Sequence, residues 1–263
     1  AARKAPRDAE PTAASERSEP DWRAYQHYLF ARHHVHQRQF DSAIQEYTNA
    51  LSIDPRSAYL RFELAQVYLR KKATAEAINE LEQAVDDDPT FVPAHVLLGR
   101  LYGGKKRRDE ARRQFLEALQ FEPSHEQAQL ALGQLFLESK QHDRALAAYL
   151  TFEQYHPGDA YGYFAISFPY TALKRYGAAI KHLRRAIDLD AGLLRARLRL
   201  ASLYEQTRRF NLAVAVYKHL QFDHPYQRSV HRALGQLLLQ MRATEPALRQ
   251  AWRATMRSAR PPP

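Results

Sequence analysis

The chain has 263 residues, of which 45% are hydrophobic; it carries 39 Lys and Arg against 29 Asp and Glu, a formal net charge of +10, and has no cysteine. The lack of cysteine excludes a disulfide framework, cysteine-ligated zinc or iron–sulfur centres and a cysteine nucleophile. No apolar run approaches the roughly 18 residues that a membrane-spanning helix needs, so the sequence offers no transmembrane candidate.

The first 21 residues differ in composition from the rest of the chain. Residues 1–21 are mainly Ala, Pro, Ser and charged residues without apolar periodicity. Such a segment buries too little surface to offset its ordering entropy, which predicts a disordered tail or tether. The first residue is Ala1 and not Met, so a processed product or a piece of a longer protein is expected. Residues 22–258 are periodic, and 259–263 are expected to fray.

The periodic region repeats every 34 residues. Seven repeats start near residues 24, 58, 92, 126, 160, 194 and 228. An alanine recurs in every repeat, at Ala43, Ala77, Ala111, Ala145, Ala179, Ala213 and Ala247. Four residues later stands an apolar residue, usually large: Tyr47, Leu81, Phe115, Tyr149, Leu183, Tyr217 and Ala251. Prolines close five of the repeats, at Pro55, Pro89, Pro123, Pro157 and Pro225.

This pattern of small and large positions resembles the tetratricopeptide repeat family. The resemblance implies an all-α fold, a right-handed α-solenoid of stacked helix–turn–helix repeats. The residues agree, because apolar side chains recur at i, i+3, i+4 and i+7 twice in each repeat. One repeat cannot bury its own apolar face, so neighbours are expected to stack. Short polar residues are predicted to cap each second helix, at Asp41, Asp109, Asp143 and Asn211.

Three arginines mark the last predicted helix. Arg249, Arg253 and Arg257 recur every four residues and form one stripe. A polar outer face suits the last element of a stack, so the array is expected to end here.

The sequence contains no convincing catalytic, metal or cofactor motif. His33, His34 and His36 crowd one helix without a carboxylate at metal-ligand spacing, and the run 86–88 of three Asp precedes a proline at a helix end. The segment 103–106 has the glycines and lysines of a phosphate loop, but it lacks the preceding strand and the full motif. These features predict a protein that is not an enzyme and that holds no metal or cofactor.

One position near the end of each first helix is basic in all seven repeats. Charge is also uneven along the chain, because residues 1–131 carry a net −1 and residues 132–263 a net +11. A cation at a helix C-terminus is favoured by about 0.3–1 kcal/mol, which explains part of the pattern. Stacking is expected to align these side chains into a basic edge, made of Arg38, Lys72, Lys106, Arg107, Lys140, Lys174, Arg208 and Arg242.

The family resemblance implies a concave groove lined by the first helix of each repeat. The candidate groove residues are Tyr25, Tyr28, Arg32, Tyr59, Phe62, Gln66, Arg100, Gln134, Tyr161, Phe164, Phe168, Arg195 and Arg199. Tyr28 and Arg32 stand where the chaperone-tail-binding branch has Lys and Asn, so that activity is not carried over. The rings Tyr161, Phe164 and Phe168 form the best single patch, because Pro169 breaks the helical rule beside them.

These features favour a non-enzymatic scaffold that binds a partner peptide or helix in its groove. Two alternatives remain: a nucleic-acid or anionic-membrane binder that uses the basic edge, and a targeting module of a longer enzyme. The groove positions carry no repeating two-residue code of the base-reading kind, which argues against nucleic acid. The architecture is similar to bacterial outer-membrane lipoproteins that help to assemble secretins and pili. This suggests a periplasmic or outer-membrane-associated place, although a cytoplasmic scaffold fits as well. The sequence sets neither the partner nor the oligomeric state.

Overall fold

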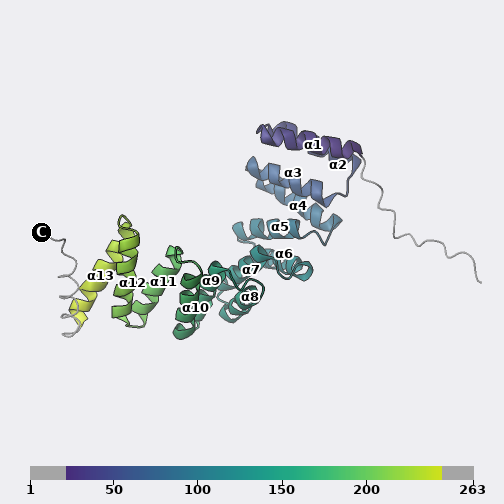
Figure 1. The fold of residues 1–263 in the computed structure, drawn as a ribbon. Coiled ribbons are helices and arrows are strands. Elements are labelled where there is room, and N and C mark those ends of the chain that lie inside the picture. The colour runs from purple at the N-terminus through teal and green to yellow at the C-terminus, as the bar shows by residue number, and fades with distance from the viewer. Residues whose placement is uncertain (1–21, 245–263) are drawn as a thin grey trace, which may run out of the picture. The chain divides into compact units, whose positions relative to one another are not determined.

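The structure, a computed structural model, describes residues 22–244, and in this range it contains thirteen α-helices and no strand. The chain divides into two compact units, Ala1–Phe121 and Glu122–Pro263, here called the N-terminal and C-terminal units (Figure 1). The predicted tail 1–21, the predicted end 259–263 and the arginine stripe of the last predicted helix lie outside the described residues.

Each unit is a series of helix pairs, one pair to a repeat, except that only the first helix of the seventh repeat, α13, lies within the described residues. The helices of the N-terminal unit are α1 (Trp22–His36), α2 (Phe40–Ile53), α3 (Ala58–Arg70), α4 (Thr74–Asp87), α5 (Val92–Gly104) and α6 (Arg108–Phe121). Those of the C-terminal unit are α7 (Glu126–Glu138), α8 (His142–Tyr155), α9 (Ala160–Ala172), α10 (Tyr176–Leu189), α11 (Leu194–Gln206), α12 (Phe210–Asp223) and α13 (Arg228–Thr244). Within each unit every helix packs on the next one along the chain, so the predicted solenoid of helix pairs is confirmed.

The packing inside a repeat depends on a small residue opposite a ring. Position 1 of a repeat is its first residue, such as Ala58, so Gly99 and Gly133 occupy position 8 and Phe115 and Tyr149 position 24. A Cβ atom added at Gly99 lies 2.9 Å from the Phe115 ring, and one at Gly133 lies 2.6 Å from Tyr149. Such distances leave no room for a side chain, so the small residue is what lets the two helices approach.

The junction between the fourth and fifth repeats shows the same size matching between repeats. Phe152 on α8 is fully buried where most other repeats have alanine, and it faces Gly162 on α9. A Cβ atom at Gly162 lies 2.3 Å from the Phe152 ring. The large ring of Phe152 on the fourth repeat therefore fits because the facing residue of the fifth repeat, Gly162, has no side chain.

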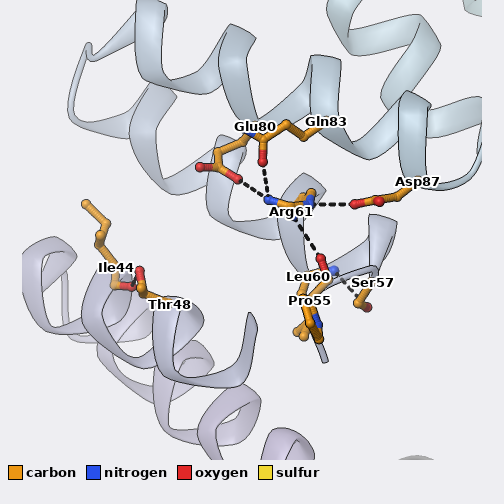
Figure 2. Close-up of polar contacts among 9 residues, drawn as sticks. All are labelled: Ile44, Thr48, Pro55, Ser57, Leu60, Arg61, Glu80, Gln83 and Asp87. Atoms are coloured by element: carbon orange, nitrogen blue, oxygen red, sulfur yellow. Dashed lines mark hydrogen bonds and ion pairs between the residues drawn. The ribbon is translucent and has the colours of Figure 1, made fainter. Parts of the chain in front are cut away.

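Arg61 on α3 ties the second repeat together through four polar contacts (Figure 2). Its guanidinium donates to Asp87 over 2.8 Å, to Glu80 over 3.2 Å, to Gln83 over 2.5 Å and to the Pro55 carbonyl over 2.8 Å. The same position of three other repeats also bonds the carbonyl of the preceding proline, through His95, Gln129 and His231. This position therefore anchors the turn between repeats, a role that was not predicted from the sequence.

The turn inside each of the first six repeats has one residue in the left-handed region. In the second repeat this residue is Lys72, with φ 63°. Its amide donates to the Leu69 carbonyl and the next amide, of Ala73, donates to the Tyr68 carbonyl, which is the Schellman end of a helix. Glycine is the usual residue here, because a Cβ atom in this conformation costs about 1 kcal/mol. All six residues are basic: Arg38, Lys72, Lys106, Lys140, Lys174 and Arg208.

The predicted capping of the second helices is wrong. Asp41, Asp109, Asp143 and Asn211 are each the second residue of their helix, which is two residues after the N-cap position. The residues that stand at the cap of α2, α8 and α12 accept no side-chain hydrogen bond, because the Schellman turn leads directly into the next helix. The acidic residues act instead through their charge in the first helical turn.

Prolines behave in two ways in this fold. Each second helix that is followed by a repeat-closing proline ends two residues before it, as at Ile53 and Pro55. Pro169, in contrast, lies inside α9, which continues past it to Ala172. The hydroxyl of Thr171 donates to the Ser167 carbonyl over 2.6 Å and so supports the backbone beside the proline.

Candidate functional site

Three tyrosines of the predicted groove meet in the N-terminal unit. The ring centroids of Tyr25 and Tyr28 are 5.9 Å apart, and those of Tyr28 and Tyr59 are 5.8 Å apart. The hydroxyls of Tyr28 and Tyr59 are 3.0 Å apart, and Arg32 donates to the Tyr28 hydroxyl over 2.8 Å. Tyr25 is 59% exposed and Tyr59 44%, so both rings are open to a ligand. Tyr25, Tyr28, Tyr59 and Arg32 are called the tyrosine cluster below.

A hollow of about 220 Å³ lies beside the tyrosine cluster. Its wall is mainly apolar, with the polar groups of Asp54 and Ser57 at one side. Its lining residues are Ala24, Tyr25, Tyr28, Asp54, Ser57, Tyr59 and Leu60. Asp54 and Ser57 lie in the turn between the first two repeats and were not predicted, because groove residues were expected on the helices alone.

The hydroxyl of Tyr59 is a neutral hydrogen-bonding group at ordinary pH. The hydrogen bond from Tyr28, together with burial and the nearby Glu63 carboxylate, raises the pKa of Tyr59 to about 12. Behind the cluster, burial and the same carboxylate raise the pKa of Tyr47, whose hydroxyl donates to Glu63 over 3.3 Å. The cluster therefore offers hydroxyl donors and acceptors and one guanidinium, which match backbone amides and carbonyls of a ligand.

The other groove residues predicted in this unit lie apart from the cluster. Phe62 packs edge-on against Phe91, with the ring centroids 5.6 Å apart. Gln66 donates to Glu63 over 3.3 Å, and Arg100 on α5 is exposed. None of the three joins the tyrosine hydroxyl chain.

In the C-terminal unit the predicted aromatic patch is only partly accessible. Tyr161 is 46% exposed, but Phe164 is only 8% exposed and belongs to the apolar core. Phe168 is half-buried, and the Arg199 guanidinium lies 3.6 Å from its ring centroid. Phe164 links the two other rings, with centroids 5.7 Å from Tyr161 and 5.1 Å from Phe168, and the guanidinium of Arg199 stacks on Phe168.

Arg199 has hydroxyl and carbonyl partners but no acidic one in the described chain. It donates from Nε to the Ser167 hydroxyl over 2.8 Å and from Nη2 to the Thr171 hydroxyl over 3.3 Å. Burial without a counter-charge lowers its pKa from the usual value. The sequence marks Arg199 as unusual, because the same repeat position is alanine in the fourth, fifth and seventh repeats. Arg195 and Gln134 are exposed, and the Gln134 amide donates to Glu138 over 3.1 Å.

The basic-edge side chains are exposed in both units. This holds for Arg38, Lys72, Lys106, Arg107, Lys140, Lys174 and Arg208. Arg107 is partly neutralised by an ion pair with Glu110 and stacks 4.2 Å from the Tyr102 ring centroid. At Arg242 the seventh repeat departs from the others, because α13 runs through this residue to Thr244. The side chain of Arg242 lies outside the described part of the structure.

The histidine, aspartate and glycine motifs noted in the sequence take part in ordinary structural contacts. His34 bonds Gln39 over 2.7 Å and His33 bonds Gln37 over 2.8 Å. Asp87, of the acidic run, is a partner of Arg61 and is not simply solvated. Among the described residues no group of three or more His, Cys, Asp or Glu is placed to hold a metal ion. Gly103 and Gly104 end α5 with ordinary φ, and the left-handed residue beyond them is Lys106.

Hydrophobic helices of membrane-spanning length are also missing from the described range. Between residues 22 and 244, no helix combines the length and the apolar character that a membrane crossing requires.

Two family models described as tetratricopeptide repeat match the chain, one at residues 34–89 and 170–251 and the other at 96–160. A search of curated proteins finds no match. Among solved structures, PilF of Pseudomonas aeruginosa is 18% identical with a TM-score of 0.65, over 82% of this chain and 99% of PilF. The C-terminal part of a TPR repeat-containing protein from Cytophaga hutchinsonii is 17% identical with a TM-score of 0.70, over 80% and 87%. YrrB, described as a TPR protein with an unusual peptide-binding site, is 20% identical with a TM-score of 0.57, over 66% and 89%. At these identities the likeness shows the fold.

Proposed function

The chain belongs to the tetratricopeptide repeat family, and we propose that it is a non-enzymatic scaffold that binds an extended segment of a partner protein along its first helices. The fold supports a protein-interaction role in general. The position of the binding surface, on the tyrosine cluster and its hollow, is the specific proposal.

The observation that carries the proposal is the exposure of an organised tyrosine cluster. Isolated exposed apolar residues are normal on a protein surface, but adjoining rings beside a hollow mark a contact site. Tyrosine presents a large apolar ring with little conformational entropy and a hydroxyl that bonds a backbone group. Tyr28 is held by both Tyr59 and Arg32, so the site is largely organised before a ligand arrives.

The hollow defines the ligand further. A space of about 220 Å³ with an apolar wall accepts one medium-sized apolar side chain, and Asp54 and Ser57 accept or donate at its margin. An extended segment with one apolar anchor, with its backbone on the tyrosine hydroxyls, satisfies both features.

A peptide-display library selected on the full chain provides the test. Selected peptides are expected to share an apolar anchor, and their affinity is measured by fluorescence polarisation. Replacing Tyr25 and Tyr59 by alanine is expected to weaken binding at least tenfold, by removing about 1.4 kcal/mol or more of contact. Tyr226→Ala is the matched control, because Tyr226 is 95% exposed and lies outside the hollow.

Two results contradict the proposal. One is equal affinity of the double variant and the wild-type chain; the other is loss of binding in Tyr226→Ala to the same degree. Circular dichroism of each variant checks that the helices are retained. A role in assembling a multiprotein machine at a bacterial envelope remains a proposal based on the tail-and-array architecture alone.

A further inference from the structure

In the C-terminal unit, the guanidinium of Arg199 is held in place by groups that carry no charge. Arg199 on α11 donates from Nε to the Ser167 hydroxyl over 2.8 Å and from Nη2 to the Thr171 hydroxyl over 3.3 Å. Its guanidinium carbon lies 3.6 Å from the centroid of the Phe168 ring. The side chain is half-buried and forms no ion pair within residues 22–244. A charge that is partly withdrawn from water is normally paired, so this cation lacks the counter-charge that its surroundings call for.

The two hydroxyls that hold Arg199 are fixed as hydrogen-bond acceptors. Ser167 is completely buried, and its hydroxyl donates to the Phe164 carbonyl over 2.6 Å. The hydroxyl of Thr171 donates to the Ser167 carbonyl over 2.6 Å. Since a hydroxyl has one hydrogen, both oxygens can only accept from Arg199. Helix α9 therefore orients the guanidinium before a ligand arrives and leaves its charge in place.

Part of the guanidinium remains open for a ligand. A guanidinium has five N–H donors, two of them on Nη1. The hydrogen bonds of Arg199 in the described chain start from Nε and Nη2, and none starts from Nη1. The buried side-chain nitrogen and oxygen atoms without a partner, among the described residues, are Gln129 Oε1 and His142 Nδ1. Nη1 of Arg199 is not one of them, so its two donors are accessible to solvent.

The residues that build this arrangement depart from the repeat together. Position 8 is alanine or glycine in the six other repeats and Ser167 in the fifth. Thr171 is the only hydroxyl residue at position 12, and Arg199 is the only basic residue at position 6. The other repeats stack without such side chains, so stacking does not require them. Departures from local rules gather at functional sites, and these three meet at one point between α9 and α11.

The charges on the neighbouring helices do not neutralise Arg199. Helix α9 contains no charged residue. The acidic residue of α11, Glu205, accepts from the Tyr217 hydroxyl over 2.6 Å. Arg195, one turn before Arg199 on α11, is exposed and adds a second positive charge. The surface around Arg199 is therefore positive and has accessible N–H donors, which favours an anionic ligand.

We propose that Arg199 binds the carboxylate of an Asp or Glu side chain in a partner protein, with Nη1 as the donor. The inference rests on the proposed function, in which a partner segment lies along the first helices. Carboxylates are the anionic groups of such a segment, and they form charge-assisted hydrogen bonds with a guanidinium. A side chain is assigned and not a chain end, because α13, the next first helix, continues the array beyond Arg199.

A selection that excludes the tyrosine cluster tests this site by itself. Peptides are selected from a display library on the full chain carrying Tyr25→Ala and Tyr59→Ala, and the peptide with the highest affinity is the probe. The selected peptides are expected to share an Asp or Glu at one position. Failure of the proposed function is seen separately, as unchanged binding of apolar-anchor peptides by the same double variant.

A double-mutant cycle then locates the carboxylate. Replacing the shared acidic residue of the probe by its amide, Glu by Gln or Asp by Asn, is expected to weaken binding at least tenfold on a chain with Arg199. On Arg199→Met the two probes are expected to bind equally weakly, because the partner of the carboxylate is gone. Arg175→Met is the matched control, since Arg175 is exposed in the same unit and its loss removes the same charge. This control is expected to keep the tenfold difference.

Two further variants and measurements separate binding from a structural role. Arg199→Lys keeps the charge without the planar fork and is expected to lose most of the tenfold difference. The melting temperature of Arg199→Met is expected to be unchanged or higher, because this variant removes a half-buried charge that has no counter-charge. The proposal is overturned by an equal tenfold difference on the wild-type chain and Arg199→Met, or by selected peptides without a shared acidic residue. Probes that lose binding when their C-terminus is amidated also overturn it, since they indicate a terminal carboxylate.

Discussion

The two units share the same repeat but differ in net charge and in how their arginines are paired. Residues 1–121 carry 19 basic and 18 acidic side chains, whereas residues 122–263 carry 20 and 11, so the net charges are +1 and +9. In the N-terminal unit Arg61 is enclosed by Glu80 and Asp87. In the C-terminal unit Arg199 is half-buried beside hydroxyls and a ring, without an acidic partner in the described chain.

This difference shows that the positive charge of the protein is not a general property of the array. Position 4 of the repeat illustrates the difference. Arg61 occupies this position in the second repeat and Arg197 occupies it in the sixth. Both arginines form ion pairs, but the Asp223 partner of Arg197 is 40% exposed while the partners of Arg61 are below 20%. The cation at position 4 is therefore enclosed by largely buried carboxylates in the second repeat, whereas its equivalent in the sixth repeat pairs with a more exposed carboxylate.

The largest expected effect separates the two arginines. Arg61→Ala leaves the largely buried Glu80 without its cation and Asp87 with only the exposed Arg56 at 3.8 Å, and it is expected to lower the free energy of unfolding by about 3 kcal/mol. Arg197→Ala removes a more exposed pair and is expected to cost about 1 kcal/mol or less. Amide hydrogen exchange of the intact chain measures the stability of each unit separately. Equal losses in the two variants contradict the contrast between an enclosed and a more exposed ion pair.

A smaller effect tests the size matching in the C-terminal unit. Gly162→Ala forces a Cβ atom against the buried Phe152 ring and is expected to cost about 2 kcal/mol, seen as faster exchange in α8 and α9. The double variant with Phe152→Leu recovers most of this loss. Gly177→Ala is the control in the same unit, because no atom lies within 4 Å of its added Cβ, and it is expected to be neutral or slightly stabilising. The N-terminal unit is expected to be unaffected; a response there shows that the units are not independent.

The smallest effect is expected to be the same in both units. Lys72→Gly and Lys174→Gly relieve the left-handed conformation at φ 63° and 57° and are expected to stabilise the chain by about 0.5–1 kcal/mol each. Thermal melts of the two variants measure this. Lys72→Ala and Lys174→Ala keep the Cβ atom and remove the charge, so they are expected to show no gain. A gain in the alanine variants indicates repulsion between charges as the cause.

Much of the fold could be predicted from particular residues. The recurring alanine and the repeat-closing proline set the period. Ala43 and the alanines at the same position of the next five repeats are completely buried, and the second helices end two residues before the closing prolines. The cap assignments failed, because a Schellman turn with a basic left-handed residue has no distinct sequence signature. The site residues could be proposed by position only. Periodicity does not distinguish Tyr161, which is exposed, from Phe164, which is buried.

The sequence by itself determined the repeat, its length, the pairing of helices and the basic residue in the turn of each of the first six repeats, because these depend on local periodicity and on side-chain size. Only the tertiary structure decided which side chains meet across repeats. It joined Tyr28 to Tyr59, placed Arg199 on Phe168 and left Phe30 uncovered. These outcomes depend on the packing of neighbouring repeats, where a ring on one helix is buried or exposed according to the size of the residue that another helix brings opposite to it.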